Sequence, residues 1–115
     1  LINCVSIMNG NKTIHDTGCA IRISENGQFI YTSIRGKDCI NVFTAFPELK
    51  RIQSISCFGK TPRDIQFDIT QNYLLCANQN SKTICIFKRN EKTGLLQYDT
   101  LYHIDNPACI LPYEI

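Results

Sequence analysis

Residues 20–43 read AIRISENGQFIYTSIRGKDCINVF, and residues 64–87 read DIQFDITQNYLLCANQNSKTICIF. The second stretch begins 44 positions after the first, and the two align without a gap. Apolar residues coincide at the matched positions, as in the pairs Ile21/Ile65, Phe29/Tyr73, Ile40/Ile84 and Phe43/Phe87. The sequence therefore contains a repeated unit, and a third copy begins near Pro107.

Each unit contains short runs that are rich in Ile, Val, Phe and Tyr and that follow a two-residue period. Turn residues such as Glu25-Asn26-Gly27 and the segment 90–94 separate these runs. No stretch has the 3.6-residue period of a helix. The pattern predicts an all-β chain with strands at about Ala20–Ser24, Gln28–Ser33, Cys39–Phe43, Arg51–Cys57, Asp64–Asp68, Tyr73–Ala77, Thr83–Lys88 and Leu95–Ile104.

A period of about 40–45 residues with four strands per unit is typical of a β-propeller blade, a four-stranded antiparallel meander. We expect residues 1–14 to end a preceding blade, 15–58 and 59–104 to form two blades, and 105–115 to supply the first strand of a closing blade.

Propellers have about 4–8 blades, so about two and a half units do not close a ring. The chain also begins at Leu1 and not at a Met, which favours a fragment of a longer protein. A natural truncation and a ring completed by several copies of the chain are the alternatives. Uncovered end blades would make the isolated chain prone to self-association through its sheet edges.

The composition argues against several functional classes. The chain has 115 residues, a net charge of +2, 43% hydrophobic residues and 19% charged residues, as expected for one small folded domain. A charge this small gives no reason to expect a nucleic-acid or membrane-surface partner. Because there is no apolar run of about 20 residues and no basic-then-apolar leader, we expect neither a membrane-spanning helix nor a signal peptide within it.

The seven cysteines are odd in number and contain no CxxC pair. Secreted disulfide frameworks usually have even counts, and zinc sites need closely spaced ligand pairs. Several of these cysteines stand where Val or Ile would fit in apolar runs, namely Cys57, Cys76, Cys85 and Cys109. We expect reduced, packed thiols in a reducing compartment, the cytoplasm, with no metal and no cofactor.

In a four-stranded meander, the link into the first strand and the turn between the second and third strands lie on the same rim. These segments carry the basic residues Arg35, Lys37, Lys60, Arg63 and Lys82. Such a cluster suits an anionic ligand, because arginine can bind a carboxylate or phosphate through two hydrogen bonds. The alternative is that they are solvated turn residues. Asn78 and Asn80 could bind sugar hydroxyls or could simply suit the turn.

His15 is the candidate general base, because it adjoins Asp16 near the start of a blade. An exposed loop histidine is the alternative. Arginines stay protonated at neutral pH, so Arg35 and Arg63 can stabilise charge but cannot act as bases. Asp64 is better suited to capping a turn or to pairing with Arg63 than to abstracting a proton.

A family resemblance enters through these rim segments. The segment GKTPRDI at 59–65, followed by ANQNS at 77–81, closely resembles the C-terminal part of the seven-bladed propeller lactonases. This family includes the propeller type of 6-phosphogluconolactonase and the carboxymuconate-lactonising enzymes. The segment SIRGKDCI at 33–40 is similar to the family's Ser-Asn-Arg-Gly-His-Asp-Ser-Ile. It differs at Ile34, Lys37 and Cys39, whereas Arg35 is retained.

The resemblance runs over nearly the whole chain and implies a seven-bladed ring in which Arg35 faces the central substrate cleft and stabilises charge. It also implies that the His and Glu proposed for proton transfer lie in earlier blades, which this chain does not match. The expected substrate is a small anionic sugar lactone, with 6-phosphogluconolactone of the pentose phosphate route favoured by the basic rim. The residues expected to bind it are Arg63, Lys60, Lys37, Asn78 and Asn80.

Two alternatives remain open at the level of sequence. The first is a cycloisomerase or lactonase for a carboxymuconate-type acid, which should have a more apolar cleft. The second is a non-catalytic propeller that serves as a binding scaffold, because one fold hosts many functions. In either enzymatic case, we expect the chain alone to be incomplete and inactive.

Overall fold

The computed structural model describes residues 16–112. These residues form eight β-strands, at β1 (Thr17–Ile23), β2 (Phe29–Arg35), β3 (Cys39–Thr44), β4 (Lys50–Ser56), β5 (Pro62–Phe67), β6 (Tyr73–Asn78), β7 (Thr83–Arg89) and β8 (Leu96–His103). Nowhere between residues 16 and 112 is there a helix with the length and apolarity needed to cross a bilayer.

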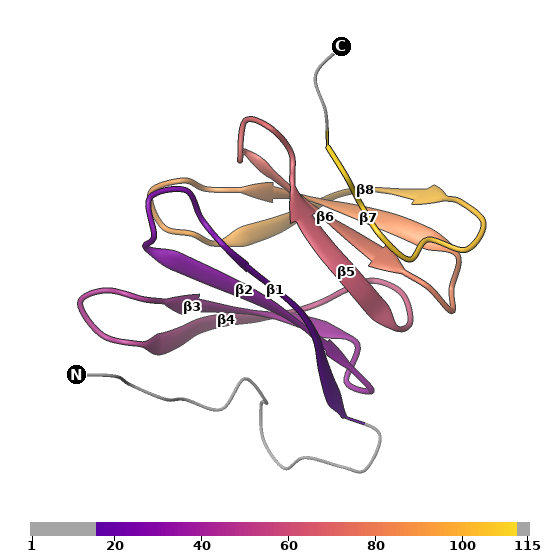
Figure 1. Cartoon of the computed structure of the whole chain (residues 1–115), viewed down its shortest axis with the longest axis horizontal. Helices are drawn as coiled ribbons and strands as arrows, with labels where there is room; N and C mark the ends of the chain where they lie inside the picture. The colour runs from indigo at the N-terminus through magenta and orange to yellow at the C-terminus, as the bar shows by residue number, and fades with distance from the viewer. Residues whose placement is uncertain (1–15, 113–115) are drawn as a thin grey trace.

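The strands form two four-stranded antiparallel meanders, in the orders β1-β2-β3-β4 and β5-β6-β7-β8 (Figure 1). The predicted all-β architecture is confirmed, and each sheet is one propeller blade. The first strand of each blade begins earlier than predicted, at Thr17 and at Pro62. Residues 104–112 form no strand, so the closing blade stays a prediction.

The repeat extends to irregular backbone features. β-Bulges interrupt the first strand of both blades at equivalent places, between Gly18 and Ala20 and between Pro62 and Asp64. Positive φ angles also recur 44 residues apart, as in the pairs Gly27/Gln71 and Asp38/Lys82. The two blades therefore share a backbone path as well as an apolar pattern.

The hydrophobic core lies between the two sheets, where β5 packs against β1 and β2 (Figure 1). Tyr31 of the first blade meets Phe67 of the second edge to face, with ring centroids 5.3 Å apart. Two further aromatic rings and a set of aliphatic and sulfur-containing side chains complete this layer, namely Phe29, Phe87, Ile40, Val42, Cys57, Ile65, Leu74, Cys76, Cys85 and Leu96. Burial of this layer supplies the main force that holds the blades together.

Two sets of polar contacts join the sheets. The Arg89 guanidinium is buried, with its Nε donating to the Gln71 carbonyl oxygen (2.7 Å) and its Nη1 donating to the Tyr31 hydroxyl (3.1 Å). The Tyr31 hydroxyl in turn donates to the Gly94 carbonyl oxygen (2.6 Å). Separately, the Gln53 amide donates to the Leu96 carbonyl oxygen and accepts from the Leu96 N–H, both at 2.8 Å.

Candidate functional site

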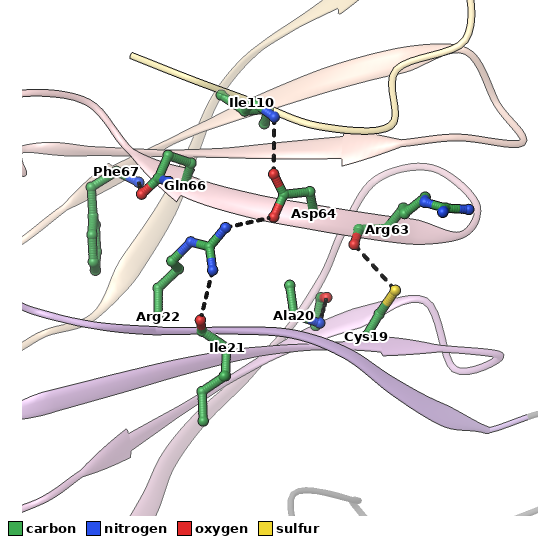
Figure 2. Close-up of polar contacts among 10 residues, drawn as sticks. Cys19, Ala20, Ile21, Arg22, Arg63, Asp64, Gln66, Phe67 and Ile110 are labelled. Carbon is green, nitrogen blue, oxygen red and sulfur yellow. Dashed lines mark hydrogen bonds and ion pairs between the residues drawn. The ribbon is translucent and has the colours of Figure 1, made fainter. Parts of the chain in front are cut away.

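The candidate site is a cleft of about 670 Å³ between the first strands of the two blades and the segment that follows β8. Figure 2 shows how β1 and β5 face each other across it. Its polar lining consists of Cys19, Arg22, Arg35, Arg63, Asp64 and Cys109. Three arginines thus line the cleft, two from the first blade (β1 and β2) and one from β5 of the second blade.

The equivalent bulges in β1 and β5 shape the rim of this cleft. Cys19 and Arg63 are the extra, unpaired residues of the two bulges. Their segments meet where the Cys19 thiol donates to the Arg63 carbonyl oxygen, at 3.1 Å (Figure 2). The Arg63 side chain is exposed, and its Nη1 donates to the Gln79 amide oxygen at 3.3 Å. Bulges commonly re-aim side chains beside functional sites.

Asp64 and Arg22 form an ion pair across the blades, with 2.9 Å between Oδ1 and Nη2 (Figure 2). The other carboxylate oxygen of Asp64 accepts a hydrogen bond from the Ile110 N–H, also at 2.9 Å. The lining therefore carries three guanidinium groups against one carboxylate, a formal charge of +2. A partly desolvated surface with this charge favours an anionic ligand.

Arg35 ends β2 and contributes the third guanidinium group. Its Nε is buried and has no hydrogen-bond partner, and the ion pairs of residues 16–112 do not include it. The Nε of Arg22 is likewise buried and has no hydrogen-bond partner among residues 16–112. The structure places Arg35 and Arg63, both singled out from the sequence, in one cleft.

The other basic residues of the predicted rim lie outside the lining of this cleft. Lys37 pairs with the buried Asp16 at 3.6 Å. Lys60 and Asn80 are exposed, and the Asn80 N–H donates to the Lys60 carbonyl oxygen at 3.2 Å. The link before β5 therefore does share a rim with the β6–β7 turn, as predicted. His15, the candidate base, lies outside the described residues.

Asn78 is an internal residue and not a rim residue. Its side chain is fully buried, its Nδ2 donates to the Cys57 carbonyl oxygen at 2.9 Å, and its Oδ1 accepts from the Cys76 thiol at 3.3 Å. The expected role in binding a sugar is incompatible with this burial, because an enclosed amide has its hydrogen-bonding capacity used within the blade. Asn78 instead fixes the end of β6 to the segment that leaves β4.

Four of the six described cysteines, Cys39, Cys57, Cys76 and Cys85, are buried, and none of the six forms a disulfide. Burial raises the pKa of Cys85 to about 12 and also raises the pKa of Cys39. A hydrogen bond with Cys76 lowers the pKa of the enclosed Cys57 and raises that of Cys76. These thiols pack the blades and are inaccessible as nucleophiles.

The prediction that Cys109 is packed in a strand is wrong. Residues 104–112 form no strand, and Cys109 is exposed. Between residues 16 and 112, no group of three or more His, Cys, Asp or Glu side chains could hold a metal ion.

Sequence reasoning missed Arg22 and Cys19 as residues of the cleft. Within the pattern Ala20-Ile21-Arg22-Ile23, the apolar positions predict the buried face, yet Ile21 and Ile23 are 57% and 58% exposed. Arg22 and Ala20 are the half-buried residues of this strand. A charged residue inside an otherwise apolar strand was the only signal that could have identified it.

A family model described as "Lactonase, 7-bladed beta-propeller" matches residues 1–112. The chain belongs to this family. Its relatives include the 6-phosphogluconolactonase of Bacillus subtilis (31% identical, covering 95% of this chain and 32% of the relative). The 6-phosphogluconolactonase of Formosa agariphila is 40% identical and covers 67% of this chain and 23% of the relative. The chain spans less than a third of the length of these propeller lactonases.

Solved structures agree with this assignment. A protein from Lactobacillus plantarum superimposes with a TM-score of 0.86 at 31% identity, covering 91% of this chain and 32% of that one. The periplasmic gluconolactonase PpgL of Pseudomonas aeruginosa superimposes with a TM-score of 0.76 at 25% identity, covering 82% and 27%. The two sheets are therefore consecutive blades of a lactonase propeller.

Proposed function

We propose that this chain forms part of the substrate cleft of a lactonase that hydrolyses an anionic sugar lactone, with 6-phosphogluconolactone as the favoured substrate. The observation that carries the proposal is the cluster of Arg22, Arg35 and Arg63 in one cleft of formal charge +2. The relatives named 6-phosphogluconolactonase support the choice of a phosphorylated sugar.

Lactone hydrolysis needs a base that activates water, and donors that stabilise the oxyanion formed when water adds to the carbonyl. Arginines supply donors and permanent positive charge but no base. Asp64 is the one carboxylate in the lining, and its two oxygens accept from Arg22 and from the Ile110 N–H. We therefore assign charge stabilisation and anion binding to this chain, and the base to a residue outside positions 16–112.

Arg35 and Arg63 have separate roles in this proposal. Arg35 is half-buried with a partnerless Nε, so it is suited to stabilise charge near the reacting carbonyl. Arg63 is exposed at the rim and is suited to hold an anionic group remote from that carbonyl. Such an anchor positions the ring for attack by water.

The test measures hydrolysis of 6-phosphogluconolactone and of unphosphorylated gluconolactone by the full-length protein and its variants. We expect Arg35→Ala to lower kcat by about 100-fold, the effect typical of removing one oxyanion donor. Arg63→Ala should raise KM for the phosphorylated lactone more than for the unphosphorylated one. Arg51→Ala is the matched control, because Arg51 is exposed on β4 outside the cleft.

Wild-type turnover by Arg35→Ala would disprove the assigned site. If the wild-type protein hydrolyses neither lactone, the hydrolytic proposal fails. Hydrolysis of a carboxymuconate-type lactone in preference to both sugar lactones would instead support the alternative, a lactonase for a carboxymuconate-type acid.

A further inference from the structure

Asp64 lies where three segments of the chain meet. It belongs to β5 of the second blade, its Oδ1 receives the Arg22 guanidinium of β1, and its Oδ2 receives the Ile110 N–H from the segment after β8 (Figure 2). Its side chain is only 10% exposed, so both hydrogen bonds are largely shielded from water. Charge-assisted hydrogen bonds of this kind are short and strong, and they fix the groups that they join.

The Asp64 carboxylate restricts where the Arg22 guanidinium can lie. One terminal nitrogen of Arg22 donates to Asp64 and the other donates to the Ile21 carbonyl oxygen, at 3.0 Å. Without the carboxylate, three guanidinium groups would repel one another in one cleft. A side chain as flexible as arginine would then swing toward solvent and lose its fixed position.

We propose that Asp64 is the positioning residue of this cleft, which holds Arg22 in the lining that it shares with Arg35 and Arg63 and fixes the segment at Ile110 as a further wall. The proposal rests on the proposed binding of an anionic lactone and assigns Arg22 a direct part in it. Asp64 itself does not touch the substrate. Its effect reaches the ligand through Arg22.

Positioning and simple charge make opposite predictions for the removal of Asp64. A carboxylate that acted only through its negative charge would weaken anion binding, so Asp64→Asn would lower KM. A carboxylate that positions Arg22 strengthens anion binding, so Asp64→Asn should raise KM. We expect an increase of about tenfold, the effect of losing one charge-assisted hydrogen bond to the ligand.

The experiment is a double-mutant cycle in the full-length protein with Asp64→Asn, Arg22→Gln and the double variant. We expect each single variant to raise KM for the lactone by about tenfold, and the double variant to be no worse than either one. Such non-additivity is the signature of two residues that act as a unit. The pH profile of kcat should be unchanged, which separates positioning from proton transfer by Asp64. Asp99→Asn is the control, since Asp99 pairs with Lys88 on β7, outside the cleft.

Three results would overturn the proposal. These are a lower KM in Asp64→Asn, additive effects in the double variant, and a pH profile of kcat in Asp64→Asn that lacks one of the two ionisations seen in the wild type. If Asp64→Asn does not fold, the test rests on Arg22→Gln. An unchanged KM in Arg22→Gln would show that Arg22 does not bind the substrate.

Calorimetric titration with inorganic phosphate separates this proposal from the proposed function. If the wild type binds phosphate without hydrolysing lactone, weaker binding by both single variants still supports positioning. If the wild type binds no phosphate and hydrolyses no lactone, both proposals fall.

Discussion

The close approach of the β7–β8 turn to the first blade gives a sharp test of the packing described here. Gly94 has a φ of +77° and is buried against Phe29. A Cβ atom at position 94 would lie 2.6 Å from the Cγ and Cε1 atoms of the Phe29 ring. Gly94→Ala therefore combines an unfavourable backbone conformation with a collision in the layer between the blades.

Gly27 offers a matched control because its φ is +74° and a Cβ there would meet nothing within 4 Å. We expect Gly27→Ala to lower the free energy of unfolding by about 1 kcal/mol through backbone conformation alone. Gly94→Ala should cost that amount plus about 1–3 kcal/mol of overpacking. The difference between the two variants isolates the cost of the collision.

Urea unfolding of the full-length protein, followed by circular dichroism, measures both changes from the midpoint and the m value. A variant that shifts the midpoint at constant m has changed stability without changing the surface exposed on unfolding. Equal midpoints for Gly94→Ala and Gly27→Ala would refute the reasoning. That result would mean that the turn does not press on Phe29 in solution.

Two further predictions concern buried polar groups. Tyr31→Phe should destabilise the fold by about 2–4 kcal/mol, because it removes one neutral hydrogen bond, to the Gly94 carbonyl, and one from the buried Arg89 guanidinium; a loss below about 0.5 kcal/mol in urea unfolding would contradict this. Burial raises the pKa of Cys85 to about 12 from an ordinary value near 9. Between pH 9 and pH 12, the Cys85 thiol therefore keeps its proton in the folded state and loses it in the unfolded chain. The free energy of unfolding should therefore fall as the pH rises from 9 to 12, by at most about 1.4 kcal/mol per pH unit, and Cys85→Ala should flatten this slope; an unchanged slope in Cys85→Ala would contradict it.

The repeat made most of the fold predictable. Pairs such as Ile40/Ile84 and Phe43/Phe87 predicted equivalent strands, because apolar residues recur at matched positions of the two units. Their burial differs, however, since Ile40 belongs to the core between the sheets and Ile84 does not. The starts of β1 and β5 were predicted too late, since each carries a bulge that breaks the two-residue period. Pattern reasoning assumes unbroken alternation and cannot place an extra residue.

The same limit applies to the cleft. Arg35 and Arg63 could be identified because turn chemistry and family resemblance both point to them. The partner of Asp64 could not be identified, since sequence proximity favours Arg63 and the structure selects Arg22 from the neighbouring blade. For Asn78, the predicted role in sugar binding was wrong because of its position in the sequence. A polar residue at the end of a strand resembles a rim residue, whereas its amide is enclosed by Cys57 and Cys76.

The contact between Gln53 and Leu96 has a consequence for association between molecules. Leu96 begins β8, the last strand of its sheet, so its outward N–H and carbonyl are positioned to pair with a strand from another chain. The Gln53 amide occupies both groups at 2.8 Å, as a neighbouring peptide unit would. The first backbone hydrogen-bonding groups of this sheet edge are thus already paired with a side chain of the adjacent blade. A propeller protected in this way resists strand addition at the point where its outermost strand begins.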